Sequence, residues 1–431
     1  MKEMYYYPKI LVVGRIAWTK DESTLSNIFC DYPSDKISYI CIETRNPDFS
    51  RCKRHFQISE IAMIRKIFMW NIKTGNALTS EKTTIDFDNE KQEKRVLRHV
   101  RAHRSILFLF LREILWWLGG WKSKELNKFI SDSNPDIIFC VGDPLPLMNK
   151  LERFVIKQAG KPAVLFLMDD IYSYTTCHNI QNRFYRWMLR CQVIPLIKSC
   201  KAHFAISPKM KGECDELFGT NCVLLTKGIE KVADPLQQVH SPISIAYTGN
   251  LLYGRFGTLA AIAKTIERIN KQGQCRALLN IYTQTEVDDV KRRLLDIPGV
   301  SYLHKPVPYS CLSGIYEASD IVLFIESLEE QYKYVARLSF STKLTDYMAS
   351  GRCIFAVGAE DIAPMEYLRD ADIGIQCNSL KEIDEKLTDL LFHQEKILSM
   401  ANKSLFYGEK NHNKQMMHKR FLNVINDAYN G

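Results

Sequence analysis

One short stretch of the chain combines groups that could hold a phosphate. Ser341 and Thr342 are followed by Lys343, and Asp346 comes one helical turn later. The pattern predicts a helix of about nine residues that Ser341 or Thr342 caps and that Gly351 ends. The first N–H groups of a helix have no intrahelical acceptors, and the helix dipole adds positive charge there. Backbone, hydroxyls and Lys343 could therefore bind an anion together, with Asp346 accepting from sugar hydroxyls beside it.

A second stretch with binding chemistry runs from Gly249 to Gly257. It follows the apolar run 243–248 and contains three glycines and Arg255. Glycines let the backbone approach a ligand closely, and a guanidinium offers a fork of donors that suits a phosphate. We expect Gly249 and Arg255 to contribute to the same anion site.

Carboxylates follow two other apolar runs, which we interpret as strands. Asp143 comes after 135–141, and Asp169 and Asp170 come after 163–168. Open α/β sheets bind their ligands beyond the carboxyl ends of the strands. A carboxylate there could orient an acceptor hydroxyl or take its proton. An Asp-Asp pair can also cap a helix, and Gly-Asp-Pro is also a turn signal.

The order of the segments 300–309, 312–325, 340–351 and 372–375 resembles the donor half of GT-B glycosyltransferases, in particular the family-four-like retaining enzymes. In that family a strand preceded by "Tyr-x-x-Ala-Asp-Ile" comes before a "Ser-Lys-Leu-x-Glu-Tyr-x-Ala-Ser-Gly" helix. The resemblance extends over roughly 200–400. It implies two Rossmann-like α/β domains and a nucleotide diphosphate sugar as donor.

The resemblance also implies roles for single residues. Asp346 matches the second acidic residue of the family's "Glu, seven residues, Glu" motif, which implies a ribose contact. The first acidic position falls on Leu338, so half of that motif is missing. Many relatives have a histidine where this chain has Asp169 and Asp170, so the resemblance places these two carboxylates on the acceptor side.

The length of 431 residues exceeds the size at which one core stops growing, so we expect two domains. Strand patterns typical of a buried parallel sheet begin at residue 9 and again at 243. Between them lies a polar, proline-flanked linker over 232–242. The polar stretch 73–90 is expected to be a loop.

These boundaries define three parts. We predict an N-terminal acceptor-binding Rossmann-like domain over 1–235 and a C-terminal nucleotide-sugar-binding Rossmann-like domain over 242–405, facing each other across a cleft. The remaining segment, 406–431, is expected to form a helix that packs back on the N-terminal domain, as it does in proteins that this chain resembles.

Composition narrows the classes of partner. The net charge of +9 is modest, and no nucleic-acid-binding motif accompanies it, so nucleic acid is not expected. Thirteen cysteines without a Cys-x-x-Cys pair, and the lack of a signal-peptide pattern, indicate reduced thiols in the cytoplasm. His99 and His103 are crowded by arginines, which would repel a cation. We expect no metal and no tightly bound cofactor.

Residues 91–121 suggest contact with a membrane surface. The cationic run Lys94–Arg104 adjoins five aromatic side chains, which are Phe108, Phe110, Trp116, Trp117 and Trp121. One long helix could lie in the membrane interface with its apolar face down and its cations on lipid phosphates. Alternatively, it is an ordinary domain helix whose tryptophans pack on the sheet.

The favoured hypothesis is a cytoplasmic glycosyltransferase, peripheral at the inner membrane face. It would move a hexose, with retention, from a nucleotide sugar to a glycan or lipid-linked acceptor in surface polysaccharide synthesis. Two alternatives stay open. The chain could be a non-catalytic subunit of the same fold that activates or scaffolds a partner transferase, or a nucleotide-sugar epimerase.

Overall fold

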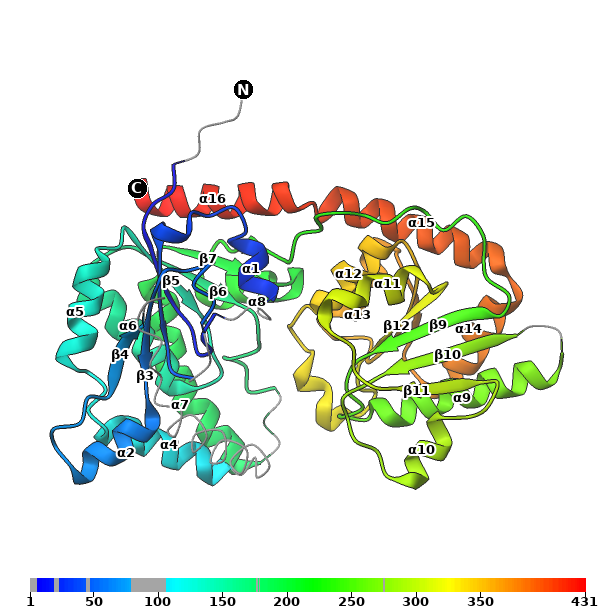
Figure 1. Ribbon diagram of the computed structural model, residues 1–431, viewed down its shortest axis with the longest axis horizontal. Helices are drawn as coiled ribbons and strands as arrows, with labels where there is room; N and C mark the ends of the chain where they lie inside the picture. Colours follow the sequence, from blue (N-terminus) through cyan, green and yellow to red (C-terminus); the bar gives the residue numbers. More distant parts are fainter. Residues whose placement is uncertain are drawn as a thin grey trace. The chain divides into compact units, whose positions relative to one another are not determined.

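The chain forms two compact units. The computed structural model describes residues 6–18, 23–43, 47–78, 106–175, 177, 179–273 and 276–431. Unit 1 comprises the residues up to 206 together with 210–225 and 418–431, and unit 2 comprises 207–209 and 226–417. Each unit has its own sheet and its own helices (Figure 1).

The sheet of unit 1 has eight strands in the order β4-β3-β2-β1-β5-β6-β7-β8. All neighbouring strands are parallel except β3 and β4. The strands are β1 (Ile10–Val13), β2 (Ile37–Cys41), β3 (Arg54–Ile58), β4 (Gly75–Leu78), β5 (Ile137–Val141), β6 (Ala163–Leu167), β7 (Ala202–Ala205) and β8 (Val223–Leu224). The central strands are apolar and almost entirely buried because helices cover both faces of a parallel sheet.

The α-helices described between β1 and β8 are α1 (Ser23–Ile28), α2 (Glu60–Phe68), α4 (Ile106–Leu118), α5 (Lys124–Ser133), α6 (Pro146–Ala159), α7 (Ile180–Ser199) and α8 (Pro208–Phe218). Helix α6 begins with Pro146 and ends at Gly160, which takes the left-handed conformation that glycine allows. The last helix, α16 (Lys414–Asn430), contributes Phe421, whose ring packs on those of Phe139 and Phe204.

The sheet of unit 2 has six parallel strands in the order β11-β10-β9-β12-β13-β14. The strands are β9 (Ile243–Thr248), β10 (Ala277–Tyr282), β11 (Ser301–His304), β12 (Ile321–Ile325), β13 (Cys353–Val357) and β14 (Ile375–Cys377). The α-helices are α9 (Arg255–Lys271), α10 (Asp289–Leu295), α11 (Leu312–Glu317), α12 (Thr342–Ser350), α13 (Ala363–Ala371), α14 (Leu380–Phe392) and α15 (Gln394–Asn411).

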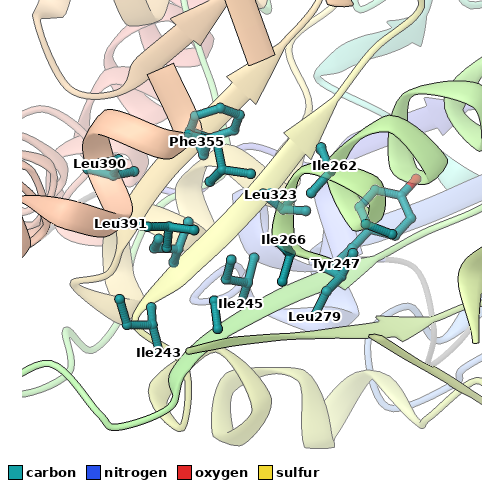
Figure 2. Close-up of a cluster of buried hydrophobic side chains, with 14 of the residues drawn as sticks. Ile243, Ile245, Tyr247, Ile262, Ile266, Leu279, Leu323, Phe355, Leu390 and Leu391 are labelled. Atoms are coloured by element: carbon teal, nitrogen blue, oxygen red, sulfur yellow. The ribbon is translucent and has the colours of Figure 1, made fainter. Parts of the chain in front are cut away.

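The core of unit 2 is formed by hydrophobic side chains that lie at every second position of its strands. Ile243, Ile245 and Tyr247 of β9 point to one face, because side chains two apart on a strand share a face. There they meet residues of α9, including Ile262 (Figure 2). Helices α9 and α14 contact each other, whereas α11, α12 and α15 contact β9, β12 and β13. The sheet is therefore the middle of three layers.

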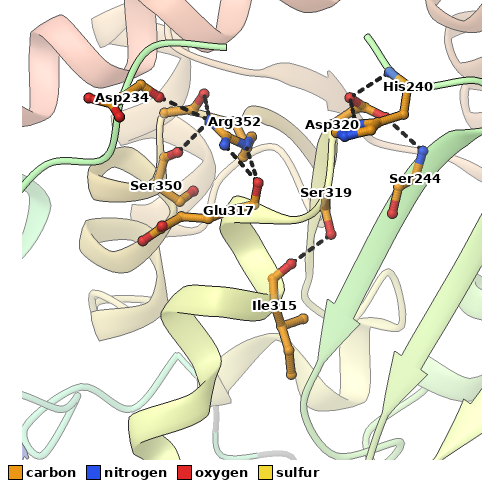
Figure 3. Close-up of polar contacts among 10 residues, drawn as sticks. Asp234, His240, Ser244, Ile315, Glu317, Ser319, Asp320, Ser350 and Arg352 are labelled. Atoms are coloured by element: carbon orange, nitrogen blue, oxygen red, sulfur yellow. Dashed lines mark hydrogen bonds and ion pairs between the residues drawn. The ribbon is translucent and has the colours of Figure 1, made fainter. Parts of the chain in front are cut away.

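Two buried polar side chains fix the linker to unit 2. The Asp320 carboxylate accepts hydrogen bonds from the backbone N–H groups of His240 and Ser244, at 3.1 and 2.7 Å (Figure 3). The Arg352 guanidinium donates to the Asp234 carbonyl in the linker, at 3.4 Å, and to the Glu317 carbonyl at 2.7 Å. Asp320 belongs to the "Tyr-x-x-Ala-Asp-Ile" pattern, so the pattern has a structural reason here.

The structure agrees with most of the predicted elements. Helix α12 has nine residues and ends at Gly351, whose φ is 60°. Ser341 stands at its N-cap position but makes no capping hydrogen bond through its side chain, so the predicted cap is wrong in that respect. The loop predicted over 73–90 was also wrong in part, because Gly75–Leu78 form β4. This strand lies at the sheet edge, where polar residues are tolerated.

Candidate functional site

The chain order of the strands reverses beside β9 in unit 2. From β9 the chain proceeds outward through β10 and β11, and it then returns to β12 on the other side of β9. Ligands of open α/β sheets bind outside the carboxyl ends of the strands at such a switch point. Gly249 follows β9, and Glu326 follows β12. We therefore take the ends of these two strands as the candidate site.

Lys343, from the first turn of α12, reaches this edge of the sheet. Its Nζ donates to the Thr248 carbonyl at the end of β9, at 2.7 Å. A Cβ at Gly249 would lie 2.7 Å from the same Nζ, so glycine leaves the room that this lysine needs. Burial, helped by the charge of Arg255, lowers the pKa of Lys343 to about 8. A lysine whose pKa is lowered by burial is a candidate for a functional site, and an ammonium group can bind an anion there.

Arg255 joins the two strand ends. Its Nε donates to the Ile325 carbonyl at the end of β12, at 2.9 Å, and its Nη1 donates to Asn250 Oδ1 at 2.9 Å. Its Nη2 forms an ion pair with Glu326. These contacts hold the guanidinium at the switch point, where sequence reasoning expected it to meet a phosphate. Glu326 was not anticipated, although it directly follows an apolar strand pattern.

The loop that carries Arg255 is strained. Tyr253 has a φ of 58°, in the left-handed region that side chains other than glycine rarely adopt. Such a residue costs about 1–3 kcal/mol and persists where the surroundings require it, often at binding sites. Its ring lies 5.8 Å from the Arg255 guanidinium, and a Cβ at Gly254 would lie 2.4 Å from Glu329 Oε1. The backbone is thus fixed tightly around Arg255.

The start of α12 brings the other predicted donors to the same unit. Ser341 has an extended backbone and precedes the helix, and Thr342 and Lys343 are its first two residues. All three are half-buried. The first-turn N–H groups of a helix have no acceptor within the helix. This helix start and the lysine that reaches Thr248 form one positively polarised surface.

Asp346 lies one turn further along α12 and has a partner that was not anticipated. The Lys227 ammonium forms an ion pair with Asp346 and donates to the Tyr309 hydroxyl. Burial raises the pKa of Asp346, and Lys227 opposes that shift. A ribose whose hydroxyls donated hydrogen bonds to Asp346 would therefore meet Lys227 and Tyr309 as well. Lys227 comes three residues after the end of β8, and this position near a strand end is its sequence signal.

Unit 1 has its own switch point, between β1 and β5. Arg15 comes just after β1, and its Nε lies 3.4 Å from a carboxylate oxygen of Asp143, just after β5. Burial raises the pKa of Asp143 to about 6, while Arg15 lowers it. Asp143 also accepts from the Leu145 N–H, so the turn reading of Gly-Asp-Pro has a structural basis.

The two candidate carboxylates after β6 differ. Asp169 has an exposed side chain, but the protein around it still partly desolvates its carboxyl group. This desolvation and neighbouring Asp170 raise its pKa, while Arg15 lowers it. Asp170 Oδ1 accepts from the Ser173 N–H at 3.0 Å and lies 4.0 Å from an Arg186 nitrogen. Asp170 thus has local structural contacts, whereas Asp169 presents its carboxylate to solvent beside a switch point.

The arrangement offers different chemistry in each unit. In unit 2, two cations and a helix start can bind a diphosphate, with Asp346 one turn away. In unit 1, an exposed carboxylate near the half-buried Arg15 can accept a hydroxyl proton. The histidines 99 and 103, considered above as metal ligands, and the cationic run 94–104 lie outside the described residues.

No protein-family model and no curated protein sequence matches this chain. Solved structures match along nearly its whole length. HepE of Anabaena in complex with UDP has 12% identity and a TM-score of 0.62, covering 97% of this chain and 100% of its own. OtsA without ligand has 12% identity and a TM-score of 0.55, covering 97% and 98%. The pneumococcal O-GlcNAc transferase GtfA, with UDP and GlcNAc, has 12% identity and a TM-score of 0.53, covering 72% and 61%.

These similarities, at this level of identity, concern the fold. The predicted class, two Rossmann-like bodies of the GT-B architecture, is confirmed: each unit carries a sheet that is mainly parallel, with helices packed on it, as in the GT-B glycosyltransferases. The chain therefore has the GT-B fold.

Proposed function

We propose that this protein transfers a sugar from a nucleotide diphosphate sugar to a hydroxyl of an acceptor. The observation that carries the proposal is the meeting of Lys343 and Arg255 at the β9–β12 switch point, beside the first turn of α12. Two cations and a helix start in one place match the negative charge of a diphosphate.

The transfer needs charge stabilisation more than covalent help from the protein. The bond from the anomeric carbon of the sugar to the diphosphate breaks, and a new bond forms from that carbon to the acceptor oxygen. Negative charge grows on the departing diphosphate, where Arg255 and Lys343 would stabilise it. The acceptor proton goes to a carboxylate or to a phosphate oxygen of the leaving group.

For the donor we propose a UDP-sugar, transferred with retention as a hexose. HepE and GtfA were crystallised with UDP, which supports this choice of base. The resemblance of 340–351 to family-four-like retaining enzymes supports retention. In this reading Ser341, Thr342, Lys343 and Arg255 bind the diphosphate beside Gly249. Asp346 then contacts the ribose, after exchange of its ion pair with Lys227.

For the acceptor we propose a lipid-linked glycan, used in surface polysaccharide synthesis at the inner membrane face. Asp169 is the stronger candidate for taking the acceptor proton, because Asp170 is engaged by Ser173 and Arg186. Its raised pKa suits a group that must gain and lose a proton. The N-terminal unit would then serve the acceptor and the C-terminal unit the donor.

A second candidate function has one specific observation in its favour. Leu338, at the first acidic position of the family motif, is fully buried and offers no polar group. A protein that binds the nucleotide sugar without this carboxylate could activate or scaffold a partner transferase instead of reacting.

Purified protein incubated with labelled UDP-sugars distinguishes these functions. Slow release of UDP and free sugar, or transfer to a lipid-linked acceptor, supports the transferase. Binding without any turnover supports the scaffold, and epimer formation supports an isomerase. Failure to bind any nucleotide sugar would remove the proposal.

A further inference from the structure

Large apolar side chains are exposed on three helical segments of unit 1. Phe68 at the end of α2 exposes 80% of its surface, and Trp70, just after it, exposes 89%. Trp117 of α4 exposes 75% and Ile180 of α7 exposes 83%. Aromatic side chains offer roughly 150–250 Å² each, so these residues present several hundred square ångströms to solvent. Where such side chains lie close together, exposed apolar area of this size marks an interaction surface.

The three segments lie together. Helix α4 contacts both α2 and α7, and Figure 1 shows them at the same end of unit 1. The Arg112 guanidinium on α4 forms an ion pair at 2.7 Å with Glu60 on α2, and the rings of Phe110 and Phe184 join α4 to α7 with centroids 5.7 Å apart. Trp117 and Trp187 line one hollow of about 430 Å³ between α4, α6 and α7. We call this surface, from Phe68 to Trp187, the apolar face.

The tryptophans predicted for a membrane contact separate into two groups. Trp117 is exposed on the apolar face, whereas Trp116 and Trp121 are almost fully buried. Trp116 donates from its indole N–H to Glu60, and its ring lies 5.5 Å from that of Trp121. Membrane contact therefore stays a prediction for Trp117, whereas the burial of Trp116 and Trp121 fits the alternative, packing within the domain.

A cationic groove adjoins the apolar face. It has a volume of about 430 Å³ and is lined by four cations, Lys122, Lys150, Arg153 and Lys157. None of the described residues that line it is acidic. Lys150 lines both this groove and the apolar hollow, so the two features share a border. Four cations without a carboxylate among them attract anions.

One carboxylate, Glu113, lines the apolar hollow. It accepts a hydrogen bond from the Leu147 N–H at 3.0 Å. Burial raises its pKa to about 7, so its charge near neutral pH is partial. Glu113 therefore opposes an anionic partner less than an exposed carboxylate would.

We propose that the apolar face and the cationic groove together bind the surface of an anionic phospholipid bilayer. The aromatic side chains enter the boundary between headgroups and acyl chains, and the lysines and Arg153 contact lipid phosphates. This deepens the peripheral location proposed above and rests on it, but the surface lies on unit 1 and donor binding on unit 2. None of the helices in the described part of the chain has the length and hydrophobicity to cross a bilayer.

Charge complementarity favours a membrane over a second protein. The cores of protein interfaces are poor in charged residues, and lysine in particular is depleted there. Here four cations border exposed tryptophans, the combination found in segments that lie in membrane interfaces. A second copy of this chain would place two cationic grooves near each other.

Co-sedimentation with vesicles tests the proposal. The full chain is mixed with vesicles of phosphatidylcholine alone or with 30% phosphatidylglycerol, at low and at high salt. We expect binding that needs the anionic lipid and weakens as salt rises. The double variant Arg153→Gln/Lys157→Gln should bind roughly 25-fold more weakly, at about fivefold for each cation. The double variant Trp70→Ala/Trp117→Ala should bind at least tenfold more weakly.

Matched variants on unit 2 provide the controls. Lys264 and Arg293 are exposed cations, and Phe406 exposes 68% of its surface. Lys264→Gln/Arg293→Gln and Phe406→Ala should bind vesicles like the unchanged protein. UDP affinity, measured by calorimetry on every variant, separates this proposal from the proposed function, because loss of vesicle binding should leave it unaltered.

Three outcomes would overturn the proposal. The protein could stay in the supernatant with anionic vesicles at low salt, or the surface variants could bind as well as the controls. The third is a concentration-dependent dimer, seen by light scattering, that the Trp70→Ala/Trp117→Ala variant abolishes while vesicle binding is absent. That result would assign the apolar face to a second copy.

Discussion

The lowered pKa of Lys343 makes nucleotide binding depend on pH in a defined direction. Burial and the nearby charge of Arg255 bring this pKa to about 8, below the ordinary lysine value of 10.5. The unliganded protein therefore loses this positive charge as pH rises through 8. A bound diphosphate favours the ammonium form and raises the same pKa. Binding above pH 8 must then take up a proton.

The size of the effect follows from the fraction of Lys343 that is charged. A pKa of about 8 gives roughly three quarters of the ammonium form at pH 7.5 and roughly one tenth at pH 9.0. UDP itself is almost fully ionised over this range, because a terminal phosphate loses its second proton near pH 6. The association constant for UDP should thus fall about eightfold between these two pH values.

Calorimetry in buffers with different ionisation enthalpies measures both the association constant for UDP and the number of protons taken up on binding. We expect UDP binding to take up about half a proton at pH 8 and close to one at pH 9. Lys343→Met should abolish the uptake and weaken binding by about 1.5 to 3 kcal/mol at pH 7.5. Lys264→Met, at an exposed lysine of α9, should change neither quantity. If Lys343→Met shows the same affinity, pH profile and proton uptake as the unchanged protein, Lys343 does not contact the diphosphate.

Three further predictions concern single side chains. Gly249→Ala places a Cβ 2.7 Å from Lys343 Nζ, so calorimetry should show UDP binding at least tenfold weaker, and unaltered affinity would contradict the close approach. Asp169→Asn should lower the turnover of a UDP-sugar by about 100-fold or more with donor affinity intact, and full activity would move the base elsewhere. Asp320→Ala leaves the N–H groups of His240 and Ser244 without an acceptor, so urea unfolding should show that the free energy of unfolding falls by about 2–4 kcal/mol. The control Glu385→Ala, which removes an exposed ion pair, should lower the free energy of unfolding by less than about 0.5 kcal/mol. An Asp320→Ala midpoint equal to that of Glu385→Ala would refute that account.

The local elements could be predicted because their signals are local. Apolar runs predicted β9, β12 and β13, and Gly351 marked the end of α12. Strand β4 escaped prediction because it is short, lies in a stretch that is polar as a whole, and pairs with β3 residues 17 or more positions away. An edge strand of this kind is defined by its neighbour more than by its own side chains.

The candidate site could be predicted only in part. Ser341, Thr342 and Lys343 follow from the helix start, since capping residues and a lysine at one end of a helix are visible in the sequence. The partners Glu326 and Lys227 could not be predicted from the sequence. Glu326 lies 71 positions from Arg255, and Lys227 lies 119 positions from Asp346. Such pairs depend on the order of strands in the sheet, which periodicity does not contain.

The central claim is that the switch point between β9 and β12 holds a nucleotide diphosphate. A crystal structure of the protein with UDP tests it most directly. The account predicts the diphosphate beyond the ends of these strands, with its oxygens within hydrogen-bond distance of Lys343 Nζ, the Arg255 guanidinium or the first-turn N–H groups of α12. UDP bound instead at the switch point of unit 1, beside Arg15 and Asp143, would contradict it.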